Sequence, residues 1–202
     1  MNYYISDLHL CHKNVIKLDN RPFETIEEHD TELIRRWNEK VSNKDRVYIL
    51  GDLCWSKENE WARIVSQLNG KKVLIRGNHD PKHLSVHTRR LFEDVKDYKE
   101  IRDDGRRVIM CHYPIPFYKA DYNEDTYMLH GHVHDTRENK ILNSLKEQIK
   151  ISRENALSAE LADSHAYNRA QIYNVGAMMP WMDYTPQTLD EIIFKYMLEE
   201  EI

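Results

Sequence analysis

The interpretation of this chain starts from its first ten residues, Met1-Asn2-Tyr3-Tyr4-Ile5-Ser6-Asp7-Leu8-His9-Leu10. Aromatic and β-branched residues open the stretch and favour a strand. Alternate side chains of a strand point to the same face, so we expect Asp7 and His9 to leave the strand end together. A carboxylate and an imidazole both bind transition metals. The pair alone decides little, because a turn Asp beside a surface His is the commoner case, but later stretches end in the same chemistry.

The composition is that of an ordinary globular protein. The chain has 202 residues, 41% hydrophobic and 31% charged, which suits one domain with a real core, or one domain with an appendage. The net charge of −5 provides no electrostatic footprint for duplex DNA or an anionic membrane, so we expect neither as a partner. A nuclease stays open, because bound metal ions would supply local positive charge.

The cysteines and the N-terminus predict a cytoplasmic protein. Cys11, Cys54 and Cys111 are odd in number and far apart, which is typical of reduced thiols. No basic segment followed by an apolar run precedes the first strand, so we expect no signal peptide. No apolar run approaches the ~20 residues that span a bilayer.

Hydrophobic periodicity predicts alternating strands and helices in the first half of the chain. After the first strand we expect a helix from the capping box of Thr25 and Glu28 to about Val41, a strand over 46–50, a helix over 58–69 ended by Gly70, and a strand over 72–76. This order predicts parallel βαβ units with right-handed crossovers. Ligands of such sheets bind beyond the carboxyl ends of the strands.

The second half is predicted to be a mixture of strands and long helices. The expected elements are a helix over 82–92, a hairpin of strands 95–101 and 106–110 closed by Asp103-Asp104-Gly105, a strand over 126–129, a strand over 171–175, and a final helix after the capping box of Thr188 and Glu191. We expect a single domain over 1–202 with a helical insertion at about 136–170. This charged segment would be a cap over the site, a surface for a homo-oligomer, or a solvated helical pair.

Seven residues with nitrogen or oxygen ligand atoms fall at predicted strand ends or in a loop nearby. They are Asp7, His9, Asp52, Asn78, His112, His132 and His134. Taken singly, each residue could be a turn residue, a helix cap, a core His or a solvated side chain. Taken together, the seven indicate a shared site. The set contains no thiolate and suits Mn²⁺, Fe, Zn²⁺, Ni²⁺ or Co²⁺. Seven ligands are too many for one tetrahedral ion but suit two ions. Two ions ~3.5–4 Å apart can hold both the attacking and the leaving oxygen of an in-line displacement at phosphorus.

In chain order, these motifs resemble those of the calcineurin-like metallophosphoesterase superfamily. The matching stretches are Asp7-x-His9, Gly51-Asp52, Gly77-Asn78-His79-Asp80, His112 and Gly131-His132-x-His134. The resemblance spans residues 1–134 and implies a four-layer α/β sandwich, with two mixed sheets flanked by helices. Asn174-Val175-Gly176 and a late proline resemble a branch of small bacterial single-domain members with poorly defined substrates.

The resemblance also implies roles for individual residues. One divalent metal would be held by Asp7, His9, Asp52 and His134, and the second by Asp52, Asn78, His112 and His132, with Asp52 bridging. His79 would face the phosphate and stabilise charge or protonate the leaving oxygen, and Asp80 would position that loop. The implied activity is a phosphodiesterase or phosphatase in which a metal-bridging hydroxide attacks a small phosphate ester.

One departure from the family narrows the substrate. In protein serine/threonine phosphatases an Asp-Arg pair that contacts phosphate follows the Gly-Asp motif, whereas this chain continues Leu53-Cys54-Trp55-Ser56-Lys57. The departure argues against protein dephosphorylation and favours a small diester slightly. A nuclease for single strands or ends is the alternative, although the acidic net charge argues against its basic channel. A non-catalytic scaffold, as in the related retromer subunit, would lack ligands that are all present here.

Five further residues have weaker signals. His12 and Arg21 are candidate substrate contacts, although a surface ion pair is the default for Arg21. His130 shares a face with the later ligands, and we expect it to support them from behind. For Trp55 and Tyr113 we expect core packing over lining the pocket.

Overall fold

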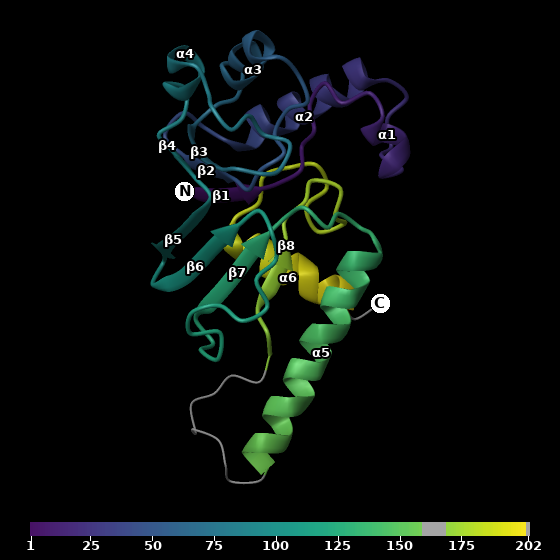
Figure 1. Ribbon diagram of the computed structural model, residues 1–202, viewed down its shortest axis with the longest axis vertical. Helices are drawn as coiled ribbons and strands as arrows, with labels where there is room; N and C mark the ends of the chain where they lie inside the picture. The colour runs from purple at the N-terminus through teal and green to yellow at the C-terminus, as the bar shows by residue number, and fades with distance from the viewer. Residues whose placement is uncertain (159–168, 201–202) are drawn as a thin grey trace.

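The computed structural model describes residues 1–158 and 169–200, and its two four-stranded sheets are stacked between helices (Figure 1). The first sheet has the order β1 (Asn2–Ile5), β2 (Arg46–Ile49), β3 (Lys71–Ile75) and β4 (Asp94–Lys96). The second has β5 (Tyr98–Asp103), β6 (Arg106–Cys111), β7 (Thr126–His130) and β8 (Ile172–Asn174). The helices are α1 (Val15–Leu18), α2 (Ile26–Lys40), α3 (Glu58–Val65), α4 (Val86–Arg89), α5 (Arg137–Ser158) and α6 (Leu189–Glu200).

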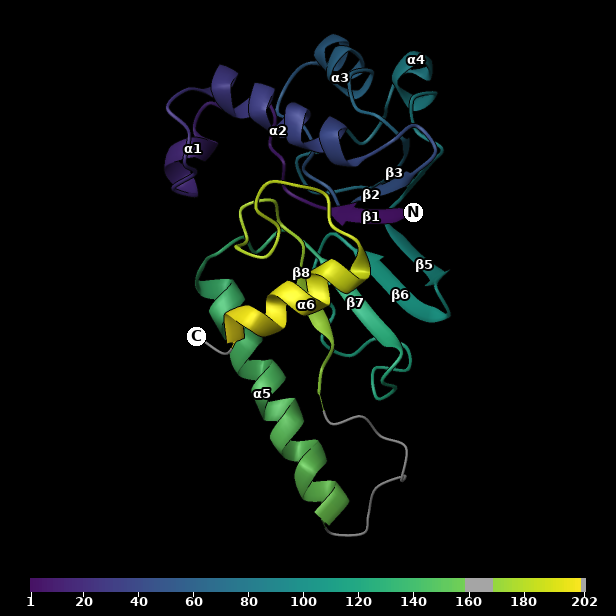
Figure 2. The same ribbon diagram turned by 180° about the vertical axis from the view of Figure 1, so that it is seen from behind.

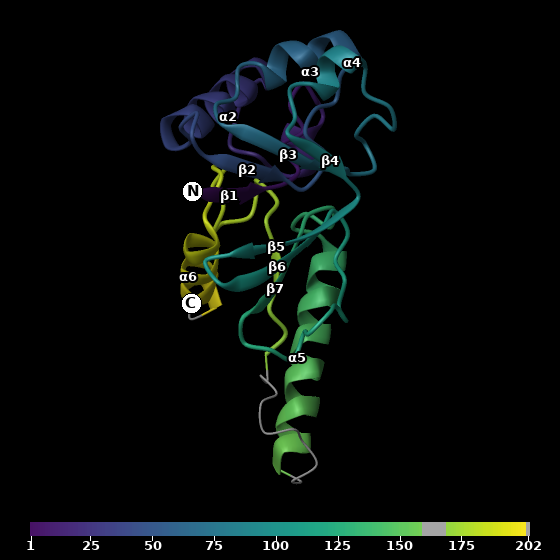
Figure 3. The ribbon, with the colours of Figure 1, turned by 90° about the vertical axis from the view of Figure 1, so that its left-hand side faces the viewer.

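The four strands of the first sheet are parallel throughout, as the strand–helix alternation predicts. An isolated antiparallel bridge joins Tyr4 to Gln187. Helices α2, α3 and α4 lie over the outer face of this sheet (Figure 3). The indoles of Trp37 in α2 and Trp61 in α3 are fully buried in the resulting core. The buried strands read as continuous apolar runs because both faces of the sheet are covered.

The second sheet is mixed and separates two apolar clusters. Strands β5 and β6 form an antiparallel hairpin, while β6, β7 and β8 run parallel. Ile109, Met128 and Ile172 pack in one cluster with Leu142 and Ile149 of α5. Alternate strand residues point the other way, into the central core shared with the first sheet. The layers are therefore helices, sheet, sheet and α5, which confirms the predicted four-layer class, and α6 lies on the opposite side of the second sheet from α5 (Figure 3).

A buried tyrosine links the two sheets. The Tyr4 hydroxyl donates a hydrogen bond to Asp103 Oδ2 at 2.7 Å, and Asn2 Nδ2 donates to Oδ1 of the same carboxylate at 2.8 Å. Tyr4 itself is fully buried and stacks on Tyr48 of the neighbouring strand at a centroid distance of 5.4 Å. Hydrogen bonds from Asn2 and Tyr4 thus join β1 of the first sheet to the last residue of β5 in the second sheet.

Three predicted elements differ from the structure. The strand expected over 95–101 is two strands that meet near Asp97, because β4 pairs with the first sheet and β5 with the second. The helix expected over 82–92 is only the single turn Val86–Arg89, where the Ser85 hydroxyl accepts from the Thr88 amide and begins the turn. The helix expected over 58–69 ends at Val65, and non-helical turns lead from there to Gly70.

Of the charged segment 136–170 that is expected to be a helical insertion, Arg137–Ser158 form α5. Residues 159–168 lie outside the described part of the chain, and the single-domain assignment stays a prediction. Helix α5 runs away from the first sheet along the long axis of the molecule (Figures 1 and 2). Over residues 1–158 and 169–200, no helix has the length and apolar character that crossing a bilayer requires.

The tyrosine link makes a prediction about stability. Tyr4→Phe removes the hydroxyl that donates to Asp103, and we expect the free energy of unfolding to fall by about 1.5 kcal/mol, as for a hydrogen bond to a charged group. Tyr3→Phe is the matched control, because within the described residues the Tyr3 hydroxyl donates only to the weakly accepting Met1 sulfur, at 3.7 Å. Urea unfolding followed by circular dichroism measures both values. Equal losses of unfolding free energy in the two variants would show that the hydrogen bond between Tyr4 and Asp103 does not stabilise the fold.

Candidate metal centre

The structure brings all seven predicted ligands to one rim, where strand ends of both sheets meet. Asp7 and His9 follow β1, Asp52 follows β2 and Asn78 follows β3, all from the first sheet. The second sheet supplies the other three, His112 after β6 and His132 and His134 after β7. Two sheets therefore contribute to one site, which explains why the ligands are spread over more than 120 residues of sequence.

One group of ligand atoms lies around Asp7, His9 and His134. The Nε2 atoms of His9 and His134 are 3.2 Å apart. Oδ1 of Asp7 is 3.4 Å from Nε2 of His134 and 3.9 Å from Nε2 of His9. Each of the three side chains directs a lone-pair atom toward the same small volume, as one ion would require.

A second group lies beside the first and contains His112, Asn78 and His132. Oδ1 of Asn78 is 2.9 Å from Nε2 of His112 and 2.9 Å from Nδ1 of His132. Oδ2 of Asp52 is 3.6 Å from Nε2 of His112 and 3.7 Å from Nε2 of His9. A single Asp52 oxygen therefore faces both groups. The buried Asp7 carboxylate also comes close to both, since its oxygens cluster with Asp52 and His112 as well.

These separations fit divalent transition metals. Two donors bound to one ion at ~2.1 Å lie roughly 3.0 Å apart in octahedral and roughly 3.4 Å apart in tetrahedral geometry. The observed distances within the groups fall between 2.9 and 3.9 Å. Imidazole nitrogens, carboxylates and one amide oxygen make up the donors, which suits Mn²⁺, Fe, Zn²⁺ or Ni²⁺.

The backbone at the ligands is unusual. Five of the seven have positive φ, namely Asp7 (53°), His9 (51°), Asp52 (53°), His132 (68°) and His134 (44°). Residues other than glycine rarely adopt this region, and Asp and His tolerate it better than most. Such conformations cost about 1 kcal/mol or more each and gather at functional sites.

The convergence of Asp7 and His9 has a different cause from the predicted one. Strand β1 ends at Ile5, so neither residue lies on a strand and the alternation of strand side chains does not apply to them. Their left-handed backbone aims the two side chains at the same place. The spacing of two was the right signal, but turn geometry explains it.

Two glycines make room for the ligands. Gly51 has φ +91°, and a Cβ there would lie 2.5 Å from Nδ1 of His112. A Cβ on Gly131 would collide with Ser6 Oγ and with Oδ2 of Asp7. A side chain at position 51 would displace His112, and one at position 131 would displace Asp7.

A buried carboxylate holds the ligand loops from behind. Asp80 accepts hydrogen bonds from the amides of Asp52, Leu53 and Gly77 at 2.8–3.0 Å. These bonds join the loops after β2 and β3, which is the positioning role expected for Asp80. Burial raises the pKa of its carboxyl group to about 6, against the opposing effect of the Gly77 amide.

Hydrogen bonds to the outer ring nitrogens orient the histidines. Nδ1 of His112 lies 2.7 Å from the Leu50 carbonyl, which can only accept, so Nδ1 carries the proton and Nε2 presents its lone pair to the site. Buried His130 lies behind the rim with Nδ1 3.0 Å from the Gly131 carbonyl. Burial lowers the pKa of His9 to about 3, which keeps its imidazole neutral as a ligand must be.

Asp19 belongs to the site although nothing in its sequence context marked it. Its Oδ1 is 2.8 Å from Nδ1 of His134. Burial alone would lower the pKa of His134, but the hydrogen bonds to Asp19 and Asp7 raise it to about 10. Burial likewise would raise the pKa of Asp7, yet His134 holds it well below its usual range.

Arg21 does not line the substrate space, contrary to expectation. Its side chain is fully buried and donates to Oδ2 of Asp19 at 2.8 Å. It also donates to the backbone carbonyls of Asp7 and Leu8, each at 2.8 Å. The guanidinium therefore fixes the Asp7 loop and the Asp19 carboxylate, and phosphate cannot reach it.

Two aromatic residues expected in the core stand instead at the rim. Trp55 is 45% exposed and lies 4.4 Å from His12 and 4.5 Å from His79, measured between ring centroids. Tyr113 is 46% exposed and packs edge-on against His132 at 4.6 Å. His12 lies beside His9 at 5.5 Å, so its contact with substrate stays a prediction. The tail residue Asn174, which sequence reasoning left without a role, donates to the His134 carbonyl at 3.0 Å.

The geometry agrees with comparisons to known proteins. A family model described as Calcineurin-like phosphoesterase matches residues 3–179. The chain belongs to the calcineurin-like phosphoesterase family. Membership of this family and the cluster of ligand side chains support a metal-dependent phosphoesterase.

Two relatives and one solved structure extend the comparison. The uncharacterized protein MJ1445 of Methanocaldococcus jannaschii is 35% identical over 156 residues, which cover 75% of this chain and 81% of that protein. The Gene 66 protein of Mycobacterium phage L5 is 30% identical over 162 residues, or 65% of this chain and 76% of that protein. The crystal structure of AQ665 from Aquifex aeolicus, a protein of unknown function, aligns over 100% of this chain and 99% of that one, with a TM-score of 0.57 and 22% identity. This last likeness concerns the fold alone.

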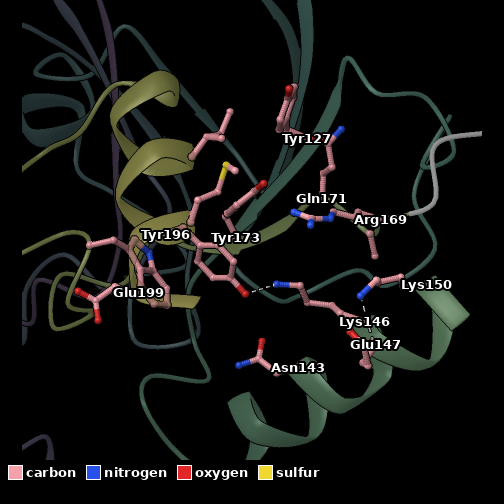
Figure 4. A pocket seen from close by; sticks show the side chains of 14 residues that line it. Tyr127, Asn143, Lys146, Glu147, Lys150, Arg169, Gln171, Tyr173, Tyr196 and Glu199 are labelled. Carbon is pink, nitrogen blue, oxygen red and sulfur yellow. Dashed lines mark hydrogen bonds and ion pairs between the residues drawn. The ribbon is translucent and has the colours of Figure 1, made fainter. Parts of the chain in front are cut away.

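A separate cavity of about 560 Å³ lies between α5, α6 and β8 (Figure 4). Tyr127, Tyr173, Tyr196 and Lys146 contribute to its lining, and the Lys146 ammonium donates to the Tyr196 hydroxyl at 2.6 Å. None of the seven candidate ligands lines this cavity. The described part of α5 thus borders this cavity, and the expected roles of residues 136–170, the cap over the site among them, stay predictions.

The Asp19–His134 contact makes the second prediction. Asp19→Asn keeps the shape of the side chain but removes the charge that orients His134, so divalent metal affinity should fall 10- to 100-fold, as for other outer partners of metal ligands. Asp121→Asn is the control, because Asp121 pairs with Arg153 away from the site at 2.9 Å. Competition with a chromophoric chelator measures both affinities. Unchanged affinity in Asp19→Asn would remove Asp19 from the metal centre.

Proposed function

We propose that this protein is a dinuclear metal-dependent phosphoesterase that hydrolyses a small phosphodiester or phosphomonoester. The observation that carries the proposal is the placement of Asp52, whose Oδ2 lies 3.7 Å from His9 and 3.6 Å from His112. An oxygen at nearly the same distance from both ligand groups suits a carboxylate that bridges two ions.

The residues divide between two ions as follows. Asp7, His9, Asp52 and His134 would hold one, and Asp52, Asn78, His112 and His132 would hold the other. When bound, two divalent metals lower the pKa of water toward neutrality and neutralise charge on the phosphoryl oxygens. The protein's part is to keep the donors in place, through Asp80 behind Asp52 and through Asp19 behind His134.

His79 is the candidate proton donor. Its amide donates to Oδ1 of Asp52 at 2.9 Å, which fixes the backbone at the rim. The imidazole is 41% exposed, and its Nε2 is 4.0 Å from Oδ2 of Asp52. A non-ligand imidazole at this place can stabilise charge or pass a proton to the oxygen that leaves as the P–O bond breaks.

The surroundings of the centre favour a diester over a monoester. A monoester carries a second negative charge, which phosphatases commonly meet with an arginine. Arg21 is buried under the ligand loop, and the segment after Asp52 supplies Leu53, Cys54 and Trp55. The exposed rings of Trp55 and Tyr113 at the rim suit the organic part of an ester.

The proposed activity is tested with a panel of aryl phosphate mono- and diesters against Mn²⁺, Ni²⁺ and Zn²⁺. We expect metal-dependent turnover, faster for diesters. Asp52→Ala should lose most bound metal by elemental analysis and nearly all activity, because it removes the shared ligand. Asp97→Ala is the control, since Asp97 makes an exposed ion pair with Arg76. Normal metal content in Asp52→Ala would refute the bridging role, and degradation of single-stranded oligonucleotides without turnover of small esters would favour the nuclease.

The role of His79 makes a separate prediction. His79→Ala should retain both metals and lose on the order of 10²–10⁴ in kcat, the usual range for a positioned proton donor. His83→Ala is the matched control, because His83 is exposed on the same connection between β3 and α4. Metal content and kcat are measured together. Loss of metal in His79→Ala would make His79 a ligand and not a proton donor.

A further inference from the structure

The His79 imidazole is held at the rim mainly by a ring contact. Its side chain makes no hydrogen bond within residues 1–158 and 169–200, although Asp52 lies 4.0 Å away. The His9 ring is 5.9 Å from it, whereas the Trp55 indole is 4.5 Å from it between centroids. The indole is thus the aromatic neighbour in closest contact with the imidazole.

Trp55 is itself placed by its backbone. Its amide donates to the Leu10 carbonyl at 2.7 Å, and Leu10 and Cys54 form a parallel bridge. The Trp61 indole donates to the Cys54 carbonyl at 3.1 Å. These bonds tie the Trp55 backbone to the loop that carries His9 and His12. The backbone of Trp55 is therefore fixed, while the residue remains 45% exposed.

Burial does not explain this arrangement, because the indole gains little by packing at an exposed rim. The other three tryptophans, Trp37, Trp61 and Trp181, are buried. Trp55 also follows Asp52 closely in the chain, so its position relative to the bridging carboxylate is set by three peptide units and the Asp80 hydrogen bonds. Such a position is suited to orienting a neighbour of Asp52.

We infer that Trp55 positions the His79 imidazole for proton transfer to the leaving oxygen, an inference that rests on the proposed phosphoesterase function. Contact with the indole limits rotation of the imidazole about its side-chain bonds. An aromatic face also attracts a cation, so the contact persists when the imidazole carries a proton. As a water-derived hydroxide forms a new bond to phosphorus, the ester P–O bond breaks and the His79 proton passes to the departing oxygen. The alcohol then leaves, and the neutral imidazole takes a proton from water.

The kinetic test uses two esters that differ only in leaving group. Phenol, with a pKa of ~10 like the tyrosine side chain, needs a proton as it leaves, whereas p-nitrophenol is far more acidic. Trp55→Leu should lower kcat for the phenyl ester by about 10- to 100-fold, as for a misplaced catalytic group. The loss for the p-nitrophenyl ester should be much smaller, with KM and metal content unchanged, and Trp55→Phe should recover most of the rate.

A double variant and a control separate this role from others. If Trp55 acts through His79, adding Trp55→Leu to His79→Ala should cause no further loss. Phe117→Leu, which removes another exposed aromatic side chain, should show no dependence on the leaving group. Additive losses, or equal losses for both esters, would overturn the inference. A rise in KM with unchanged kcat would also overturn it and assign the indole to substrate binding.

A measurement without turnover tests the contact directly. The indole should shift the His79 ring protons upfield in the NMR spectrum, and Trp55→Leu should abolish this shift while Trp55→Phe keeps part of it. His79→Gln assigns the resonances among the eleven histidines. Identical His79 shifts in the native protein and Trp55→Leu would overturn the inference. An inactive native protein would refute the proposed function instead, and the NMR comparison would then decide the contact alone.

Discussion

Two buried carboxylates impose the constraint on which this structure depends. Asp7 is 0% exposed and Asp52 is 2% exposed. Burying an ionised carboxylate without compensation costs several kcal/mol or more. Hydrogen bonds from backbone amides compensate part of this cost, since the His132 amide donates to Asp7 and the His79 amide donates to Asp52. The carboxylates also need nearby positive charge, which protonated His134 can supply in part and which bound metal ions would supply in full.

The arrangement of residues at the rim follows from the need to compensate these buried negative charges. The carboxylates lie at the ends of β1 and β2, and the imidazoles come from strand ends of both sheets. Bringing the strand ends this close requires a glycine at position 131 and left-handed backbone at five ligands. The central core between the two sheets packs behind these loops and contains most of the buried apolar side chains.

Supporting residues decide how well the ligands are held. Asp80 joins the loops after β2 and β3, and Arg21 with Asp19 joins the Asp7 loop to His134. Arg21 illustrates how a residue type can mislead. A guanidinium near metal ligands suggests phosphate binding, yet here it saturates backbone carbonyls and a carboxylate in the interior. Trp55 illustrates the reverse case, since an apolar ring expected inside the core stands exposed beside His79.

Local patterns in the sequence by themselves determined the parallel βαβ start of the chain and the seven candidate ligands, and the resemblance that these motifs carry implied the family and the four layers. Apolar runs mark buried strands, and glycine beside Asp, Asn or His marks their ends. Only the tertiary structure decided that β4 and β5 belong to different sheets, that Asp19 stands behind His134 and that Arg21 is buried. Such contacts join residues far apart in the chain, so their energies depend on packing and burial, which no local pattern of residues records.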